Sequence, residues 1–287
     1  MRDNKAFLQE ILHGLVEGKV VPYLGSGVLA LEPCEVPDGD VALASVLASQ
    51  IAVPFKLHRN LPALAPYLEN FKHRKTLAKL MTGAFSAPAK PNRLHRCLAG
   101  LRACPMIVDL WYDQALPAAL AGRSNWGQLQ GVSRSDYPGR WYRCVRADGA
   151  TVSDGEAAAW DLVLYKPWGA ATPGASFAVS DSDFVEILTE IDIQTPIPPT
   201  VQERRSGRHF LFLGCRFNTQ LDRTFARQIM KRSSTLRWAV MPEEPSRNEL
   251  RFLKEQRIER IEMPLADLVC ALEDLDAAEI APAQQSA

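Results

Sequence analysis

The sequence lacks several patterns that mark well-known classes of protein. Its six cysteines include no C-x-x-C pair, which excludes a tetracysteine zinc ribbon. No G-x-S-x-G elbow, phosphate-binding P-loop or H-E-x-x-H motif is present, so the common hydrolase, nucleotidase and metalloprotease signatures are missing. No apolar run approaches the roughly 18 residues that a membrane span requires, and we expect no membrane partner.

The sequence also lacks any excess of one charge. Lys and Arg together number 33, as do Asp and Glu, so the formal net charge is zero and we expect no nucleic-acid partner. The first residues lead into an amphipathic pattern and not into a secretory signal. Unpaired thiols suit a reducing compartment, and we therefore expect a cytoplasmic protein.

Short apolar runs alternate with helical periodicity along most of the chain, and 47% of its residues are hydrophobic. This alternation predicts βα units and a mostly parallel sheet, hence an α/β fold. The predicted strands cover 20–24, 106–110, 162–165, 210–214 and 238–241. The predicted helices cover 4–18, 41–53, 61–83, 93–101, 181–190, 219–231, 246–256 and 265–274.

Three segments depart from this pattern. Residues 122–160 are rich in Gly, Ser, Asp and Arg, and Asp148-Gly149 predicts a hairpin within what we interpret as an insertion. Pro196, Pro198 and Pro199 predict a loop. Residues 277–287 are small and polar and predict a disordered tail, so that one domain spans 1–276.

Three predicted strands end in residues that suit a binding site, since ligands of such sheets lie outside the carboxyl ends of the strands. Gly25-Ser26-Gly27 would let backbone N–H groups approach a diphosphate, or would form a plain tight turn. Asp113 would bind a ribose hydroxyl or cap a helix. Cys215 would be either a small buried residue or a reactive thiol. Arg216 would either bind a phosphate or face solvent.

Taken together, five blocks resemble the sirtuin-like superfamily, and in particular its bacterial branch of NAD-binding and NAD-hydrolysing domains. The resemblance covers residues 4–274. The blocks are Y-L-G-S-G-V at 23–28, P-N-R-L-H-R-C-L-A-G-L at 91–101, I-V-D-L-W-Y-D at 107–113, K-P-W-G at 166–169 and F-L-G-C-R at 212–216 with Asp222 beyond it.

This resemblance implies a Rossmann-like, doubly wound sheet with helices on both faces and a small inserted module. It also implies a nucleotide ligand, NAD or ADP-ribose, and no zinc. The residues that it assigns to this ligand are Gly25, Ser26, Gly27, Asp113, Gly214, Cys215 and Arg216.

Two departures from the family pattern concern its chemistry. The family's asparagine near the nicotinamide corresponds to Trp111, and its general-base histidine corresponds to Trp168. An indole donates one hydrogen bond and has no basic lone pair at neutral pH, so it replaces neither group. The resemblance therefore implies a pseudoenzyme, with Asp113 as the remaining candidate for a ribose-directed catalytic group.

Three functions follow as competing hypotheses. The leading one is a domain that binds NAD, ADP-ribose or a related nucleotide without hydrolysing it, in a sensor or regulatory role. The second is an active NAD glycohydrolase or ADP-ribosyl-transferring enzyme. The third is a protein-interaction module whose pocket is plugged by Trp111 and Trp168. The tryptophan-rich segment 122–160 would be its contact surface, or those tryptophans only pack the segment onto the sheet. The partner would be another protein or a second copy of the chain.

Overall fold

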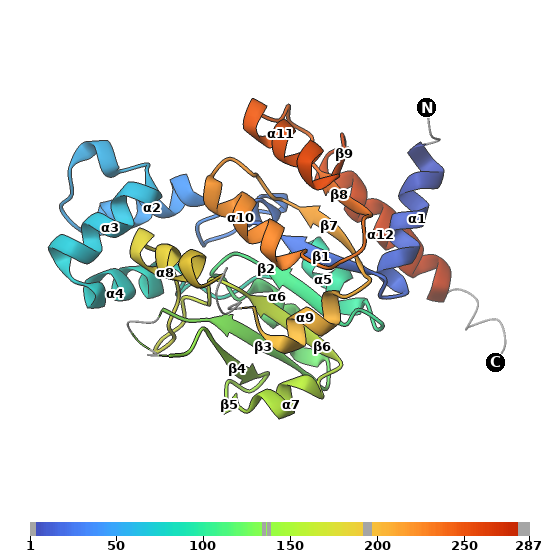
Figure 1. Cartoon of the computed structure of the whole chain (residues 1–287), viewed down its shortest axis with the longest axis horizontal. Helices are drawn as coiled ribbons and strands as arrows, with labels where there is room; N and C mark the ends of the chain where they lie inside the picture. The colour runs from blue at the N-terminus through green and yellow to red at the C-terminus, as the bar shows by residue number, and fades with distance from the viewer. Residues whose placement is uncertain (1–3, 134–135, 137–138, 192–196, 281–287) are drawn as a thin grey trace.

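The computed structural model describes residues 4–133, 136, 139–191 and 197–280, and one sheet runs through it (Figure 1). Its strands are ordered β5-β4-β3-β6-β2-β1-β7-β8-β9. Every neighbouring pair from β3 to β9 in this order is parallel, and β4 and β5 are antiparallel additions. The predicted Rossmann-like α/β fold is therefore confirmed. The strands are β1 (Val20–Leu24), β2 (Met106–Asp109), β3 (Trp126–Gly131), β4 (Tyr142–Arg146), β5 (Thr151–Val152), β6 (Leu162–Lys166), β7 (His209–Leu213), β8 (Arg237–Val240) and β9 (Glu259–Ile261).

The central strands are continuous apolar runs because helices cover both faces of the sheet. All five residues of β1 are buried. Val21 and Tyr23 belong to the core on one face, whereas Val20 and Leu24 belong to the core on the other. This division follows from the two-residue period of a strand, which points successive side chains to opposite faces.

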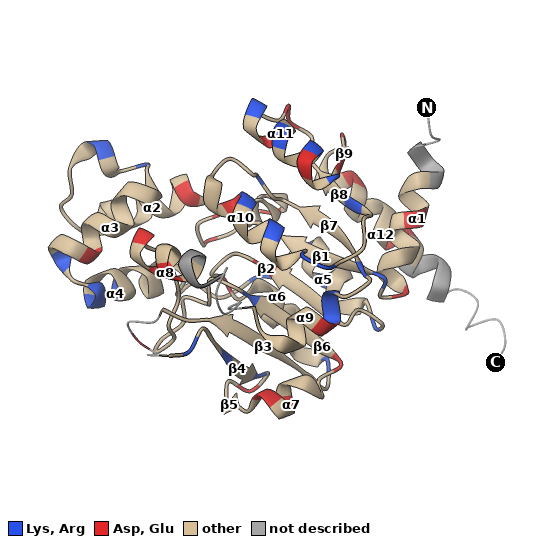
Figure 2. Ribbon diagram, in the orientation of Figure 1, with Lys and Arg blue, Asp and Glu red and all other residues tan. Residues whose placement is uncertain are grey.

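Helices form the two outer layers. Helices α2, α3, α4, α10 and α11 contribute to the core that contains Tyr23, and α1, α5 and α12 contribute to the core that contains Leu24. The helices are α1 (Asn4–Val16), α2 (Asp40–Gln50), α3 (Leu61–Lys72), α4 (Arg74–Ala84), α5 (Arg93–Gly100), α6 (Ala115–Ala119), α7 (Asp154–Ala158), α8 (Asp181–Ile191), α9 (Pro199–Arg205), α10 (Gln220–Ile229), α11 (Arg247–Gln256) and α12 (Leu265–Ile280). Charged residues of both signs lie side by side on α11 (Figure 2).

The segment 122–160 supplies one edge of the sheet. Strand β3 pairs in parallel with β6, and Trp126 lies opposite Leu162. Strands β4 and β5 form an antiparallel hairpin across the Asp148-Gly149 turn, where Gly149 has a φ of +90°. A positive φ costs glycine little, which explains its place in this turn.

Several elements differ from the sequence prediction. Helix α9 begins at Pro199, where the three prolines predict a loop, because proline is well tolerated in the first turn of a helix. Strand β9 and the short helices α6 and α7 are absent from the prediction. Helix α12 continues to Ile280, beyond its predicted end at 274 and into the predicted tail. Pro196 and residues 281–287 lie outside the described residues.

Among the helices of the described chain, none is both long enough and apolar enough to cross a lipid bilayer.

Candidate functional site

The order of winding of the sheet reverses at β1. This strand lies between β2 and β7, so that Leu24 is level with Asp109 on one side and Leu213 on the other. Doubly wound sheets bind their ligands in the crevice at such a reversal. A cavity of about 380 Å³ lies at this place, within the size range of ligand pockets.

Most of the residues assigned to the ligand by the sequence lie at this cavity. The exception is Asp113, which lines a separate cavity of about 100 Å³. The candidate residues that line the larger cavity are Gly25, Ser26, Gly27, Gly214, Cys215 and Arg216, and Trp111 and Trp168 line it too.

The loops that follow β1 and β7 pack tightly against each other. The Gly25 N–H donates to the Leu213 carbonyl oxygen at 2.9 Å, and the Gly27 N–H donates to that of Gly214 at 3.1 Å. A Cβ atom on Gly25 would lie 2.5 Å from the Gly214 oxygen. These glycines therefore allow two loops to meet, and two of their N–H groups are already engaged within the protein.

Trp111 lies in the wall of the cavity and is almost fully buried. Its indole Nε1–H donates to the Pro37 carbonyl oxygen at 2.7 Å, which ties the loop before α2 to the end of β2. Its backbone N–H donates to Asp109 Oδ1 at 3.0 Å. The indole thus serves as a structural strut between these two segments.

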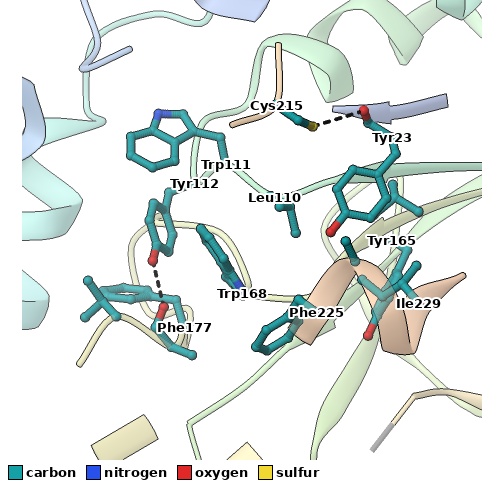
Figure 3. Close-up of a cluster of buried hydrophobic side chains, with 14 of the residues drawn as sticks. Tyr23, Leu110, Trp111, Tyr112, Tyr165, Trp168, Phe177, Cys215, Phe225 and Ile229 are labelled. Carbon is teal, nitrogen blue, oxygen red and sulfur yellow. Dashed lines mark hydrogen bonds between the residues drawn. The ribbon is translucent and has the colours of Figure 1, made fainter. Parts of the chain in front are cut away.

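Trp168 lies in the same wall, within a cluster of aromatic side chains (Figure 3). Its ring centroid lies 6.1 Å from Tyr112, 5.6 Å from Phe184 and 6.0 Å from Phe225. Its buried Nε1–H has no hydrogen-bond partner among the described residues. Both indoles therefore border an open cavity and do not fill it.

Cys215 lies beside the glycine loops and is buried. Its Sγ lies 3.5 Å from the carbonyl oxygens of Tyr23 and Leu213, to which the thiol can donate. Burial raises the pKa of this thiol well above its ordinary value, and the nearby negative charge of Asp222 raises it further. A thiol that resists ionisation is a poor nucleophile, so Cys215 contributes packing here.

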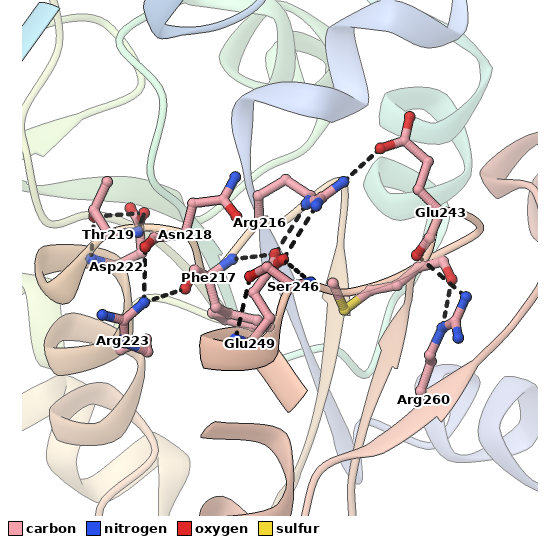
Figure 4. A network of polar contacts seen from close by, with 11 residues as sticks. Arg216, Phe217, Asn218, Thr219, Asp222, Arg223, Glu243, Ser246, Glu249 and Arg260 are labelled. Carbon is pink, nitrogen blue, oxygen red and sulfur yellow. Dashed lines mark hydrogen bonds and ion pairs between the residues drawn. The ribbon is translucent and has the colours of Figure 1, made fainter. Parts of the chain in front are cut away.

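Arg216 is engaged by acidic residues of the same chain (Figure 4). Its Nε donates to Glu249 Oε1 at 2.9 Å and its Nη2 to Oε2 at 3.1 Å, while Nη1 contacts Glu243. Glu249 is fully buried and also accepts from the backbone N–H groups of Phe217 and Ser246. Burial favours the neutral acid, but these hydrogen bonds outweigh it and lower the pKa of Glu249.

Three carboxylates surround the cavity: Asp38, Asp40 and Asp222. Burial raises the pKa of Asp222 to about 6, against the opposing hydrogen bonds from Thr219. Burial also raises the pKa of Asp40. Because Arg216 is already paired, the site offers acceptors to hydroxyl groups more readily than it offers cations to a diphosphate. The sequence analysis does not identify Asp38 or Asp40 as site residues. Their one distinguishing feature in the sequence is their place just before the predicted helix 41–53.

Asp113 and His95 do not line this cavity, and both are buried. Asp113 Oδ1 accepts from the Ala115 N–H at 2.7 Å, at the start of α6. His95 Nδ1 accepts from the Asn92 N–H, and Asn92 Nδ2 donates to the Val28 carbonyl oxygen at 2.7 Å. Burial lowers the pKa of His95 to about 4, so the imidazole is neutral and caps α5, while the Asn92 side chain links α5 to the first glycine loop.

A buried ion pair lies beneath Trp111. Lys166 at the end of β6 is fully buried, and its Nζ contacts Asp109 Oδ2 at the end of β2. The other oxygen of Asp109 accepts from the Trp111 N–H. The pair therefore joins two neighbouring strands at the edge where the cavity lies.

No metal centre is evident in the described part of the chain. None of its groups of three or more His, Cys, Asp and Glu side chains has an arrangement that could hold a metal ion.

Comparison with known families identifies the fold more closely. The profile of the SIR2-like domain family matches residues 105–261, which is more than half of the chain. No curated protein matches the sequence. The match includes Trp111, Trp168 and Arg216, whereas Gly25-Ser26-Gly27 lies outside it. The resemblance to the sirtuin-like superfamily is confirmed, and the chain belongs to the SIR2-like domain family.

Proposed function

We propose that this chain binds NAD, ADP-ribose or a related nucleotide in the cavity at the end of β1, and does not hydrolyse it. The observation that carries this proposal is an open cavity of about 380 Å³ whose wall holds two indoles, at the positions that the resemblance assigns to the family's catalytic groups. The cavity leaves room for a ligand, while Trp111 and Trp168 supply no base.

The proposed ligand contacts follow from the chemistry of the lining. The closely packed loops at Gly25, Ser26, Gly27 and Gly214 allow the ligand to approach the backbone without intervening side chains. The carboxylates of Asp40 and Asp222 would accept hydrogen bonds from ribose hydroxyl groups. Cys215 would contribute an apolar surface, and Arg216 would reach a phosphate by exchanging its contact with the exposed Glu243.

The absence of hydrolysis follows from the two indoles. A general base that takes a proton from the reacting group contributes about 10²–10⁴-fold to a rate. Since Trp168 has no such lone pair and Trp111 uses its N–H on Pro37, the family's reaction would lose both contributions. A protein that binds the nucleotide and leaves it intact suits a sensor or regulatory role.

A proton NMR time course with NAD and the purified protein tests contact and turnover together. We expect saturation transfer to the adenosine protons and no release of nicotinamide. Release at a rate proportional to protein concentration would overturn the proposal. The absence of any transfer with NAD and with ADP-ribose would overturn it as well.

A second candidate function, an NAD glycohydrolase, is favoured by one observation. Asp222 lines the cavity and has a pKa raised to about 6, which suits a group that accepts a proton near neutral pH. If the chain does release nicotinamide, Asp222→Asn should reduce the rate at least 100-fold. Release that survives this substitution would remove Asp222 as the base.

A further inference from the structure

A further cavity, of about 380 Å³, lies between helices α10 and α11. It shares no lining residue with the cavity at the end of β1. Three arginines line it, Arg223 and Arg227 from α10 and Arg251 from α11. We propose that this cavity binds the phosphate monoester of a small organic molecule, at a site separate from the proposed nucleotide site.

The lining of this cavity has a net positive charge. Glu255 is the one acid among the described residues around it, so three guanidinium groups and one carboxylate give a net charge of +2. A phosphate monoester carries a charge of about −1.5 to −2 at neutral pH. One such group therefore balances the charge of the lining.

The two arginines of α10 lie four residues apart, so their side chains project from the same face of the helix. Like charges at this spacing destabilise a helix. Within the described chain neither Arg223 nor Arg227 forms an ion pair, and the neighbouring Asp222 lines the other cavity. An anion bound between the two guanidinium groups would remove their repulsion.

Hydrogen bonds within the protein orient two of the three guanidinium groups. Arg223 Nη1 donates to the carbonyl oxygens of Phe217 and Asn218 at 2.6 and 2.8 Å, which leaves Nε and Nη2 for a ligand (Figure 4). Arg251 Nε donates to Glu255 Oε1 at 2.7 Å, which leaves the two terminal nitrogens of Arg251. Donors that are already oriented lower the entropic cost of binding an oxyanion.

The rest of the lining suits the organic part of such a ligand. Gln220 and Asn248 each present an amide, which can bond to a phosphate oxygen or to a hydroxyl group. Phe252 is buried and packs against Phe217 with ring centroids 4.9 Å apart. A volume of about 380 Å³ lies in the range of small-molecule pockets, so the phosphate would be one group of a larger molecule.

Other classes of ligand fit this lining less well. A cation would face three guanidinium groups and a single carboxylate. An apolar molecule would contact one aromatic side chain and would desolvate the charged groups around it, which is costly. A phosphate accepts paired hydrogen bonds from arginine, and this geometry makes arginine the preferred residue for binding it.

The direct test compares phenyl phosphate with phenyl sulfate, which has a similar shape and less negative charge, by calorimetric titration of the unmodified protein at constant ionic strength. We expect phenyl phosphate to bind at least about fivefold more tightly. Equal affinity of the two probes, or no binding of phenyl phosphate at millimolar concentration, would overturn the proposal without any variant.

Three variants locate the binding. Arg227→Gln should weaken phenyl phosphate binding about tenfold. Arg247→Gln is the matched control, because it removes the same charge at an exposed position of α11 outside the lining, and it should change the affinity less than about twofold. Glu255→Gln removes the opposing carboxylate and should strengthen binding about threefold.

Melting curves confirm that each variant folds. Equal affinities of the folded Arg227→Gln and Arg247→Gln proteins would contradict the assignment. Weaker binding in the folded Glu255→Gln protein would contradict it as well.

Two further titrations distinguish this cavity from other anion sites. ADP-ribose in excess should leave phenyl phosphate bound, because the two cavities share no lining residue, and displacement would overturn the assignment. A short oligothymidylate should bind no more tightly than phenyl phosphate. Tighter binding that is lost in Arg227→Gln would assign the cavity to a nucleic-acid strand and overturn the proposal of a small molecule.

Discussion

The Gly27 N–H donates to the carbonyl oxygen of Gly214 across 3.1 Å, and this contact joins two loops that lie 187 residues apart in the chain. Gly214 has a φ of +61°, and a Cβ atom on it would lie 2.4 Å from the Val28 backbone nitrogen. The pair brings the ends of β1 and β7 into one surface, and it defines one side of the cavity.

Gly214→Ala should therefore destabilise the protein and weaken nucleotide binding. The positive φ costs about 1–2 kcal/mol in any residue with a Cβ atom, and the clash with Val28 adds about 1–3 kcal/mol. Denaturant unfolding monitors the free energy of unfolding. Gly207→Ala is the matched control, because Gly207 has a φ of +70° with open space around it. Equal losses in the two variants would show that the contact between the loops contributes nothing.

Trp111→Phe tests the strut between the cavity wall and the loop before α2. Loss of the indole N–H leaves the Pro37 carbonyl oxygen without its donor, and we expect the free energy of unfolding to fall by about 1–3 kcal/mol more than in the control. The control is Trp126→Phe, since Trp126 is equally buried but its Nε1–H has no partner among the described residues. Urea titrations of both variants give the comparison, and a smaller loss in Trp111→Phe would contradict the prediction.

Arg216→Lys should destabilise the protein because an ammonium group cannot reproduce the two parallel bonds to Glu249. With Glu249 fully buried, we expect a loss of about 1–3 kcal/mol. Arg251→Lys is the control, since the Arg251–Glu255 pair is exposed and should change by less than about 1 kcal/mol. Thermal unfolding distinguishes the two. A stable Arg216→Lys protein with weakened ADP-ribose binding would instead assign Arg216 to the ligand.

Asp222 should make stability depend on pH. Its pKa of about 6 in the folded chain exceeds the value of about 3.9 for an unfolded aspartate. The folded state therefore binds the proton more tightly, so this stabilisation is complete below about pH 4 and is lost as the pH rises through 6.

The measurement is the difference in unfolding free energy between the parent chain and Asp222→Asn from pH 4 to pH 7. It should fall by up to about 3 kcal/mol with rising pH. A flat profile for Asp222→Asn would mean that its carboxyl ionises normally in the folded chain.

The sequence pattern is sufficient to predict the bounds of a strand that is almost entirely apolar. Strands β1, β6 and β7 are predicted nearly to the residue, because a strand covered on both faces consists almost entirely of apolar residues. Strand β3 has the sequence W-G-Q-L-Q-G. It is absent from the prediction because its glutamines and glycines do not form an apolar run. Its Gln128 and Gln130 can be buried because Gln130 donates to Gln128 and accepts from Arg143.

The glycine at position 127 in β3 is also explained by a contact with a residue distant in the sequence. A Cβ atom on Gly127 would lie 2.3 Å from the Trp160 ring, so the strand needs glycine where a distant indole packs across it. Neither reason is visible in the local sequence, since both depend on residues that only the fold brings together.

The sequence by itself determined the layered α/β fold, the glycine loops at the ends of β1 and β7, and the presence of Trp111 and Trp168 at the positions that the resemblance assigns to the family's catalytic groups. These follow from residue type and local period, which neighbouring residues fix. Only the tertiary structure decided that the indoles border an open cavity, that Arg216 pairs with Glu249, and that Asp113 lies outside the main cavity. Those outcomes depend on contacts between distant segments, whose distances and burial no local pattern encodes.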